Sequence, residues 1–379
     1  MSAKSLIHLV TACAIAMIAV PVTMTFARPM TGDTNEQQET QYQSDGISIA
    51  AASSDEAILE SVSVETALEH LDQGATAWST AQNCISCHTN GSFMAIRPEL
   101  TAYTSKPSDH HRDFFVEQLV AREAADPATL VSGAQPTGIA YLALGLAQWD
   151  RHVNDGRRSA ETDRAIKLMF KVQSPNGAFR NLDCWPPLES SEYHGATVAA
   201  LALGAAPEWR DASHDEELTI GKEKLIGYLT ETAPPHDYAR VLKLWAAVEF
   251  PEIMSDAERT DIVEMIFKHQ QNDGGWSMRT FAEPESWGSG NRAARIRGEE
   301  DFGAAPSDGH QTGLCILVLR KAGVPADDER IQNAIGWIKS SQRQSGRWWT
   351  RSLNTDSSHY ITFSSTCYCL LALGMCGEL

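Results

Sequence analysis

Residues 270–276 read QQNDGGW, and they are one of three copies of the pattern Gln-x-x-x-Gly-x-aromatic. The other two copies are QSPNGAF at residues 173–179 and QRQSGRW at residues 342–348. Each copy follows a segment whose apolar residues recur with helical spacing. Glycine can adopt the left-handed conformation that ends a helix, and the Gln amide can bond backbone groups left free there. The pattern therefore predicts a repeated helix end followed by a turn.

A second kind of segment follows these copies, rich in leucine and small residues and apolar on nearly every face. Such segments are found at residues 194–205, 310–322 and 359–375. A further helical pair, without the Gln pattern, is predicted at residues 216–230 and 236–249. Helices that are apolar all round are buried inside a larger assembly, whereas amphipathic helices cover it. The alternation predicts an all-α protein built as a double ring, with apolar helices inside and amphipathic helices outside.

These repeats resemble those of the squalene-hopene cyclase and protein prenyltransferase superfamily, whose α/α toroid carries Gln-Trp repeats. The resemblance covers residues 57–379 and implies an α/α toroid with an apolar central cavity. That cavity could hold an isoprenoid or another lipid-like small molecule. The resemblance says less about activity, because the Asp-x-Asp-Asp tetrapeptide with which such cyclases protonate their substrate does not occur in this chain.

The resemblance to protein farnesyltransferases raises the question of a zinc site. Those enzymes hold zinc through an Asp, a Cys two residues later, and a His just before a Thr-Cys-Tyr-Cys-Leu sequence. Residues 366–370 of this chain read TCYCL, but Ser365 stands where that His would be. Likewise, His310 replaces the Cys that would follow Asp308. Because two of the three ligands differ, we do not expect zinc.

Residues 84–88 read CISCH, a C-x-x-C-H motif. In this motif two thiols can add to the vinyl groups of haem, and the adjacent imidazole can ligate the iron. No second C-x-x-C or H-x-x-x-H pair stands nearby to complete a zinc site. We expect one covalent haem c, attached at Cys84 and Cys87, with His88 as the proximal iron ligand. A redox dithiol and a structural or other metal-binding role are the alternatives.

The haem motif is expected to lie in a turn of the repeat architecture. Residues 67–82 have a helical pattern, and residues 91–93, GSF, match the Gly-x-aromatic ending of a repeat. A haem c-binding segment at about 57–130 would then belong to the ring, with the haem in an N-terminal turn. A small appended module over the same residues is the alternative.

The second axial ligand of the iron is less well defined by the sequence. An open position would favour ligand binding or catalysis, and a filled one would favour electron transfer or a structural role. Histidines at the starts of the predicted inner helices would share one rim with the haem, where they could ligate iron, a second metal or a substrate, or simply cap the helices. The distal or rim candidates are Met94, His110, His111, His194, His236, His310 and His359.

The N-terminal residues indicate export. Residues 1–27 have a basic start, an apolar stretch at 9–22 and a small-residue end, which is typical of a signal peptide cleaved after about Ala27. The apolar stretch is shorter than the roughly 20 residues of a membrane-spanning helix, so we expect no membrane span in the mature protein. Residues 28–56 are polar and predict a flexible linker. The net charge of -18 argues against nucleic acid as a partner.

Together these features predict a periplasmic haem c protein that acts in redox chemistry or electron transfer with a redox partner protein. A hydrophobic small molecule is the other expected partner. Two alternatives stay open at this point. One is a haem-dependent or terpenoid-modifying enzyme, and the other is a ligand-binding or scaffold protein whose haem is structural.

Overall fold

The computed structural model describes residues 40–379, except residue 184 and residues 207–208 and 210–215. The described chain is mostly helical, with a single two-stranded sheet among these residues. The predicted signal peptide lies outside this part of the chain. No helix in the described part is long and apolar enough to cross a membrane.

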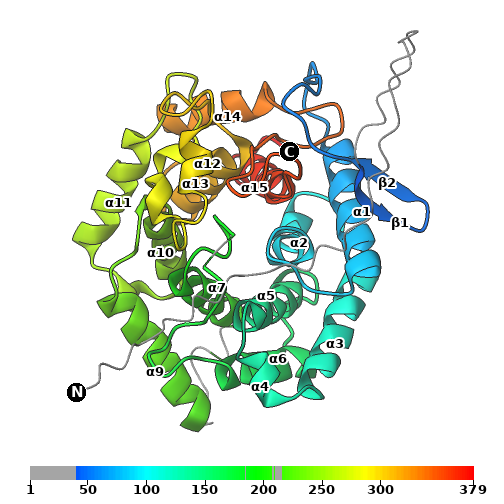
Figure 1. Cartoon of the computed structure of the whole chain (residues 1–379), viewed down its shortest axis with the longest axis vertical. Coiled ribbons are helices and arrows are strands. Elements are labelled where there is room, and N and C mark those ends of the chain that lie inside the picture. Colours follow the sequence, from blue (N-terminus) through cyan, green and yellow to red (C-terminus); the bar gives the residue numbers. More distant parts are fainter. Residues whose placement is uncertain (1–39, 184, 207–208, 210–215) are drawn as a thin grey trace, which may run out of the picture. The chain divides into compact units, whose positions relative to one another are not determined.

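Longer helices of two kinds alternate along the chain, as Figure 1 shows. Amphipathic helices lie on the outside of the arrangement and each is followed by a helix on the inside. The outer helices are α1 (Val64–Gln82), α3 (Asp109–Glu123), α6 (Ala160–Lys171), α9 (Glu216–Glu231), α11 (Asp256–Lys268) and α14 (Glu329–Lys339). The inner helices are α2 (Asn90–Ile96), α5 (Gln135–His152), α7 (Glu192–Gly204), α10 (Asp237–Glu249), α13 (Gly309–Lys321) and α15 (Ile361–Met375).

The inner helices contact one another in a closed circuit. Each of them packs against the next inner helix along the chain, and α15 packs against α2. In α15 every residue from Ile361 to Gly374 is buried, whereas α14 buries only one stripe made of Ile331, Ala334, Ile335 and Ile338. These burial patterns confirm the predicted alternation of apolar and amphipathic helices.

Short elements fill the connections between the longer helices. They are α4 (Pro127–Leu130), α12 (Ala293–Arg297) and the 3-10 helices Glu99–Ala102, Pro251–Ile253, Met278–Thr280 and Pro284–Ser286.

The glutamine of each repeat joins its turn to the start of another outer helix. The Gln342 side-chain amide donates to the Gly346 carbonyl at 2.8 Å and to the Ser63 carbonyl at 2.9 Å, and its oxygen accepts from the Ser63 N–H at 2.7 Å. Ser63 caps α1, so this contact links the last repeat to the first described helix. Gln173 and Gln270 make equivalent pairs of bonds to their own turns and to α9 and α14. The expectation that the Gln amide satisfies backbone groups is therefore confirmed.

The glycine of each repeat allows two backbones to approach closely. Gly346 has a φ of 86°, and a Cβ there would lie 2.5 Å from the Thr66 carbonyl oxygen in α1. At Gly274, with a φ of 90°, a Cβ would lie 2.6 Å from the Asn333 carbonyl oxygen in α14. Only glycine fits both the backbone conformation and the space. The repeat thus fixes how each turn packs on an outer helix.

Residues 40–50 of the predicted linker are structured, which corrects both the linker prediction for these residues and the all-α prediction. Strands β1 (Thr40–Ser44) and β2 (Ile47–Ala50) form an antiparallel hairpin that packs against α1. Tyr42 is buried in this packing, and the Arg347 guanidinium donates to the carbonyl of Ala50 at 2.9 Å. The alternation of apolar residues in this short stretch was hidden by its polar composition.

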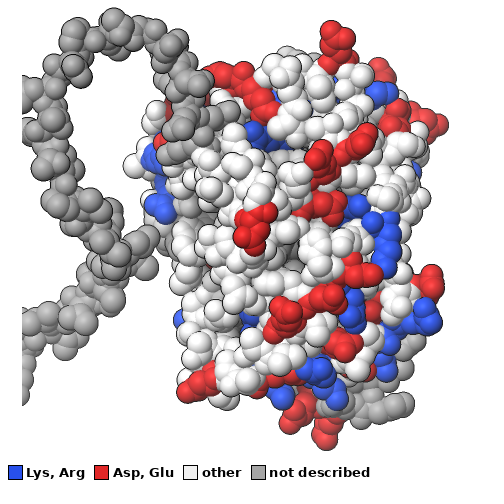
Figure 2. All heavy atoms as spheres, turned by 90° about the vertical axis from the view of Figure 1, so that its right-hand side faces the viewer, with Lys and Arg blue, Asp and Glu red and all other residues white. Residues whose placement is uncertain are grey.

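Figure 2 shows the face of the molecule that lies at the right of Figure 1, over α1 and α3. Acidic and basic side chains are interspersed on this face, with wide uncharged areas between them. The basic side chains there lie among acidic ones and do not gather into a stripe of the kind that phosphate backbones attract.

Candidate functional site

The Cys-x-x-Cys-His turn joins the outer helix α1 to the inner helix α2. Helix α1 ends because Asn83 adopts a left-handed conformation with a φ of 46°. The side chain of Asn90 then holds the turn: its oxygen accepts from the Ser86 N–H at 2.8 Å, and its amide donates to the Cys84 carbonyl at 2.9 Å. Residues 91–93, predicted to end a repeat, instead lie inside α2. The motif therefore occupies a rigid connection between the outer and inner helices.

A pocket of about 570 Å³ opens beside this turn, and we call it the His88 pocket. Its walls come from the turn itself, from the first half of α5, from residues 185–189 and from the loop at 352–361. Trp78 of α1 and Arg122 of α3 complete the lining. The volume lies within the roughly 300–1,000 Å³ of small-molecule and cofactor sites. Both cysteines of the motif and His88 line this one pocket.

His88 is oriented by a hydrogen bond and by two aromatic rings. Its Nδ1 lies 2.8 Å from the Thr89 hydroxyl oxygen, and no described residue makes a hydrogen bond with its Nε2. Trp78 packs edge-on against the imidazole at 4.7 Å between centroids, and Tyr360 stacks on it at 4.8 Å. Burial lowers the pKa of His88 to about 4, so the ring is neutral at pH 7. A neutral imidazole with Nδ1 engaged leaves the Nε2 lone pair available for a metal.

Tyr42 extends the hydrogen-bonding of His88 into the N-terminal hairpin. Its hydroxyl lies 3.2 Å from the Thr89 hydroxyl. Tyr42 also contacts Tyr360 edge-on, with the ring centroids 5.7 Å apart. No sequence pattern indicated this contact, because Tyr42 stands in a stretch predicted to be a linker. The hairpin is therefore part of the surroundings of His88.

The two cysteines of the motif differ in their surroundings. Cys84 is partly buried, and Cys87 is buried with its thiol donating to Glu189 Oε1 at 3.2 Å. Burial raises the pKa of Cys87 well above its usual value, and the nearby Glu189 raises it further. The other carboxyl oxygen of Glu189 is buried without a hydrogen-bond partner among the described residues. Nothing in the sequence around Glu189 predicted this contact.

The residues of the His88 pocket fit the chemical groups of haem c. Two thiols three residues apart match the two vinyl groups, and the Nε2 of His88 matches the iron. The buried Nε of Arg122 has no hydrogen-bond partner among the described residues, so this guanidinium can receive a carboxylate. Trp78 and Tyr360 add aromatic side chains to the lining, where they could pack against a flat ring. These are the residues that would hold a haem.

Three of the distal candidates from the sequence lie away from the His88 pocket. Met94 is buried within α2, where it faces Gly145 of α5. His110 uses both ring nitrogens, toward Thr76 and Ser108 at 2.8 Å each. His111 is paired through Nε2 with Asp72 at 3.2 Å. None of the three lines the pocket, so the structure does not bring them to His88.

His194 lies one hydrogen bond away from the pocket. Its Nε2 is 3.0 Å from the hydroxyl of Tyr141, which lines the pocket from α5. Its Nδ1 is buried and has no partner among the described residues. Burial, together with the nearby His236, lowers the pKa of His194 to about 3. The pair of Tyr141 and His194 is therefore a neutral polar group at the wall of the pocket.

The other histidines at the starts of inner helices have structural partners. His236 caps α10 by accepting from the Ala239 N–H at 3.1 Å, as the capping interpretation predicted. His310 is bonded to the hydroxyls of Tyr238 and Ser364. His359 accepts a hydrogen bond from the Ser352 N–H at 3.0 Å.

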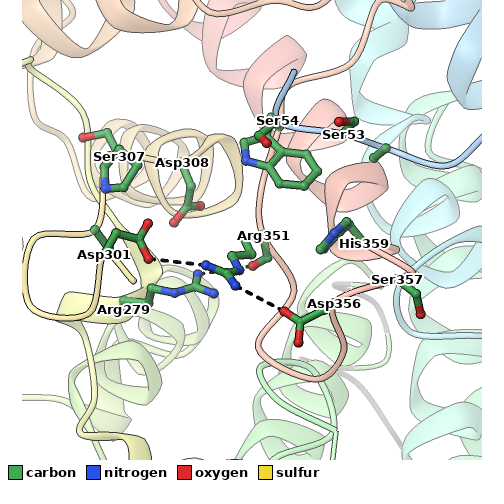
Figure 3. A pocket seen from close by; sticks show the side chains of 14 residues that line it. Ser53, Ser54, Arg279, Asp301, Ser307, Asp308, Arg351, Asp356, Ser357 and His359 are labelled. Carbon is green, nitrogen blue, oxygen red and sulfur yellow. Dashed lines mark hydrogen bonds and ion pairs between the residues drawn. The ribbon is translucent and has the colours of Figure 1, made fainter. Parts of the chain in front are cut away.

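A second pocket, of about 690 Å³, lies on the other side of the loop at 351–360, and we call it the His359 pocket. Figure 3 shows Arg351 between Asp301 and Asp356, with ion pairs of 3.4 and 3.2 Å. Arg279, deeper in the wall, is paired with Glu299. Both arginines of this pocket are therefore ion-paired, and its third acid, Asp308, accepts from backbone N–H groups.

The residues that the resemblance placed at a zinc site serve the fold. Asp308 caps α13 by accepting from the Gln311 N–H at 2.9 Å, and it accepts from the Met278 N–H at 2.6 Å. Ser365 is bonded to the Thr350 hydroxyl at 2.7 Å. Across residues 40–379, apart from those that the structure leaves undescribed, no three His, Cys, Asp or Glu side chains are grouped so that they could hold a metal ion.

Comparison with known proteins gives a likeness of structure only. No family model matches the sequence, and no curated protein matches it. Among solved structures, the type II terpene cyclase MstE from Scytonema, without ligand, is 13% identical with a TM-score of 0.46. A variant of MstE in complex with its substrate geranylgeranyl dihydroxybenzoate is also 13% identical, with a TM-score of 0.43. Each match covers 77% of this chain and 88% of the other.

Proposed function

We propose that this chain is a haem c protein that carries one covalent haem on Cys84 and Cys87 and ligates its iron through His88. The observation that supports this proposal is the His88 pocket, in which both thiols and an imidazole with a free Nε2 line one cavity of about 570 Å³. When bound, haem supplies one-electron chemistry. The function that follows is redox chemistry or electron transfer with a protein partner, in the periplasm after removal of residues 1–27.

The residues around the motif have separate roles in this proposal. Thr89 orients the imidazole of His88 and fixes which of its nitrogens is free. Arg122 would neutralise a carboxylate of the bound group. Trp78 and Tyr360 would pack on its ring and exclude water, which strengthens every electrostatic interaction inside the pocket.

We further propose that the inner and outer helices form an α/α toroid of the cyclase and prenyltransferase type, with the haem turn in place of an ordinary repeat turn. The closed circuit of inner helices supports this architecture. A lipid-like or isoprenoid ligand is the second candidate for the pocket. The apolar side chains of Ile85, Leu188 and Ile361 in its walls favour such a ligand.

The experiment that tests haem attachment is the intact mass of the mature protein, produced in a host that attaches haem c. We expect one covalent haem in the wild-type protein and none when Cys84 and Cys87 are both replaced by Ser. Cys376→Ser is the matched control, because Cys376 lies beyond the end of α15 and does not line the pocket. A wild-type protein without haem, or haem that persists in the double variant, would contradict the proposal.

A second measurement separates the redox role from the alternative of a scaffold with a structural haem. Spectroelectrochemistry of the holoprotein should show a reversible one-electron couple with the fold retained in both states. A haem that cannot be reduced without unfolding would favour a structural role. Native mass spectrometry with added geranylgeraniol tests the isoprenoid ligand, and an unchanged mass would count against it.

A further inference from the structure

Outside the haem motif, the common haem ligand types in the described lining of the His88 pocket are the phenols of Tyr141 and Tyr360. The Tyr141 hydroxyl is hydrogen-bonded to His194, and the Tyr360 ring stacks on His88 itself. The same lining contains no methionine, no lysine and no histidine other than His88. His194 has its Nε2 engaged with Tyr141, and His359 accepts the Ser352 N–H at its Nδ1. The second axial position is therefore available to a molecule from outside the described chain.

Attachment of haem would change the surroundings of Glu189. In the structure, the Cys87 thiol donates the one hydrogen bond made to the Glu189 side chain by a described residue. A thioether forms when the S–H adds across a vinyl group: the new S–C bond uses the sulfur, and the hydrogen goes to the neighbouring carbon of the former double bond. The sulfur then has no hydrogen left to donate. Glu189 would be left with both oxygens unpartnered, although its exposed fraction is only 9%.

Burying a carboxyl group without a hydrogen-bond partner is energetically costly. Two responses reduce this cost: the group keeps a proton, or it bonds a ligand in the pocket. Burial already raises the pKa of Glu189, although the bond from Cys87 lowers it. In its protonated form the carboxyl can donate a hydrogen bond, so a ligand atom with partial negative charge would satisfy it.

Tyr141 provides a second polar group on the same pocket. It is buried in α5 and lines the pocket, and its hydroxyl lies 3.0 Å from His194 Nε2. Because burial keeps His194 neutral, this imidazole can accept the phenolic hydrogen, which leaves the phenol oxygen as a hydrogen-bond acceptor. Glu189 and Tyr141 enter the pocket from different segments, one from the loop before α7 and the other from α5.

We propose that the His88 pocket binds a small ligand of the diatomic or peroxide class on the open iron position, and that Glu189 is its hydrogen-bonding partner, with Tyr141 beside it. This inference rests on the proposed haem attachment and adds the class of ligand and the residues that bind it.

Carbon monoxide is the probe for this site, added to the reduced holoprotein. We expect reversible binding, seen in the visible spectrum, and an infrared C–O stretching band that reports the polarity around the ligand. Glu189→Leu should move this band to higher frequency because it removes the hydrogen bond, while Glu189→Gln should keep it near the wild-type value. Glu192→Leu is the matched control, since Glu192 lies three residues further along, in α7, and does not line the pocket.

The possible failures can be told apart. Protein without covalent haem contradicts the proposed function and overturns this inference together with it. A haem-loaded protein that refuses carbon monoxide overturns the inference, because the iron then has two protein ligands. If Cys184→Ser restores binding, that second ligand is identified as Cys184, whose position lies outside the described residues. Binding with the same C–O frequency in wild type, Glu189→Leu and Tyr141→Phe overturns the assigned roles of the two residues.

Discussion

The hydroxyl oxygen of Thr89 lies 2.8 Å from Nδ1 of His88, on the side of the imidazole opposite to the nitrogen available for a metal. Thr89 is fully buried and bonded in turn to Tyr42. A ring nitrogen that donates to a fixed acceptor makes the other nitrogen more basic and holds the ring in one tautomer. The chain from Tyr42 through Thr89 to His88 therefore sets both the orientation and the basicity of the proposed iron ligand.

Thr89→Val removes this acceptor while nearly preserving side-chain volume. The Nδ1–H is then unsatisfied and the imidazole is a poorer donor, so the oxidised iron loses stabilisation. We expect the reduction potential of the holoprotein to rise by on the order of 40 mV, which corresponds to about 1 kcal/mol. Voltammetry of the purified variant measures this shift. Thr101→Val is the control, because Thr101 lies outside the His88 pocket, and its potential should equal that of wild type.

Buried histidines predict how stability depends on pH. Burial lowers the pKa of His194 and of His310 to about 3 in the folded protein, from 6.5 in a free side chain. Between these values the unfolded chain binds protons that the folded chain does not. The free energy of unfolding is therefore at its full value above about pH 6.5 and decreases as the pH falls toward 3. Each such histidine lowers it by at most about 1.4 kcal/mol per pH unit.

Urea unfolding at pH 7 and pH 5 measures this dependence. We expect a clearly lower free energy of unfolding at pH 5. His310→Gln should lower stability at both values, since His310 bonds two hydroxyls, but it should also reduce the difference between them. In His110→Gln, where the replaced side chain is exposed, the difference should stay as in wild type. Equal stability of the wild-type protein at both pH values would show that these histidines are not kept neutral by the fold.

Gln342, the glutamine of the last repeat, should contribute strongly to the stability of the protein. Gln342→Leu removes three hydrogen bonds that join the turn after α14 to Ser63 and Gly346. It leaves buried backbone groups unsatisfied, so we expect a loss of about 2–4 kcal/mol in the free energy of unfolding. Thermal and urea unfolding measure the loss. Gln344→Leu, two residues away and exposed, is the control and should change stability by less than about 0.5 kcal/mol.

The repeats made the helical architecture predictable, because periodicity and helix-end chemistry are local properties. Gln-x-x-x-Gly-x-aromatic marked the turns, and the apolar segments marked the buried helices. The partners of each turn were not predictable in the same way. No sequence pattern near Gln342 predicts its contact with Ser63, because Ser63 reaches it only through the packing of α1 against the last turn.

The candidate site was predictable at its motif and not in its surroundings. Cys84, Cys87 and His88 are adjacent in sequence, so a pattern finds them. Tyr42 and Glu189 reach the same place from segments far away in the chain, and neither stands in a recognisable pattern. The histidines of the inner helices do lie at helix starts, but side-chain direction gives most of them other partners. The position of a residue along a helix predicts at which end of the helix it lies, but it does not predict which residues its side chain contacts.

The N-terminal hairpin gives the last prediction, because it carries Tyr42 to Thr89 and its last strand is bonded to the buried guanidinium of Arg347. Arg347 pairs with Glu56 at 2.9 Å and donates to the carbonyls of Ala50 and Ala51. Arg347→Met keeps the apolar stem but removes these bonds, so the hairpin should detach and become open to proteases while the helices stay folded. Limited proteolysis followed by mass spectrometry should find new cleavage between residues 40 and 56. Lys339→Met, which removes an exposed pair with Glu378, should leave the cleavage pattern unchanged, and protection of the hairpin in Arg347→Met would show that other contacts hold it.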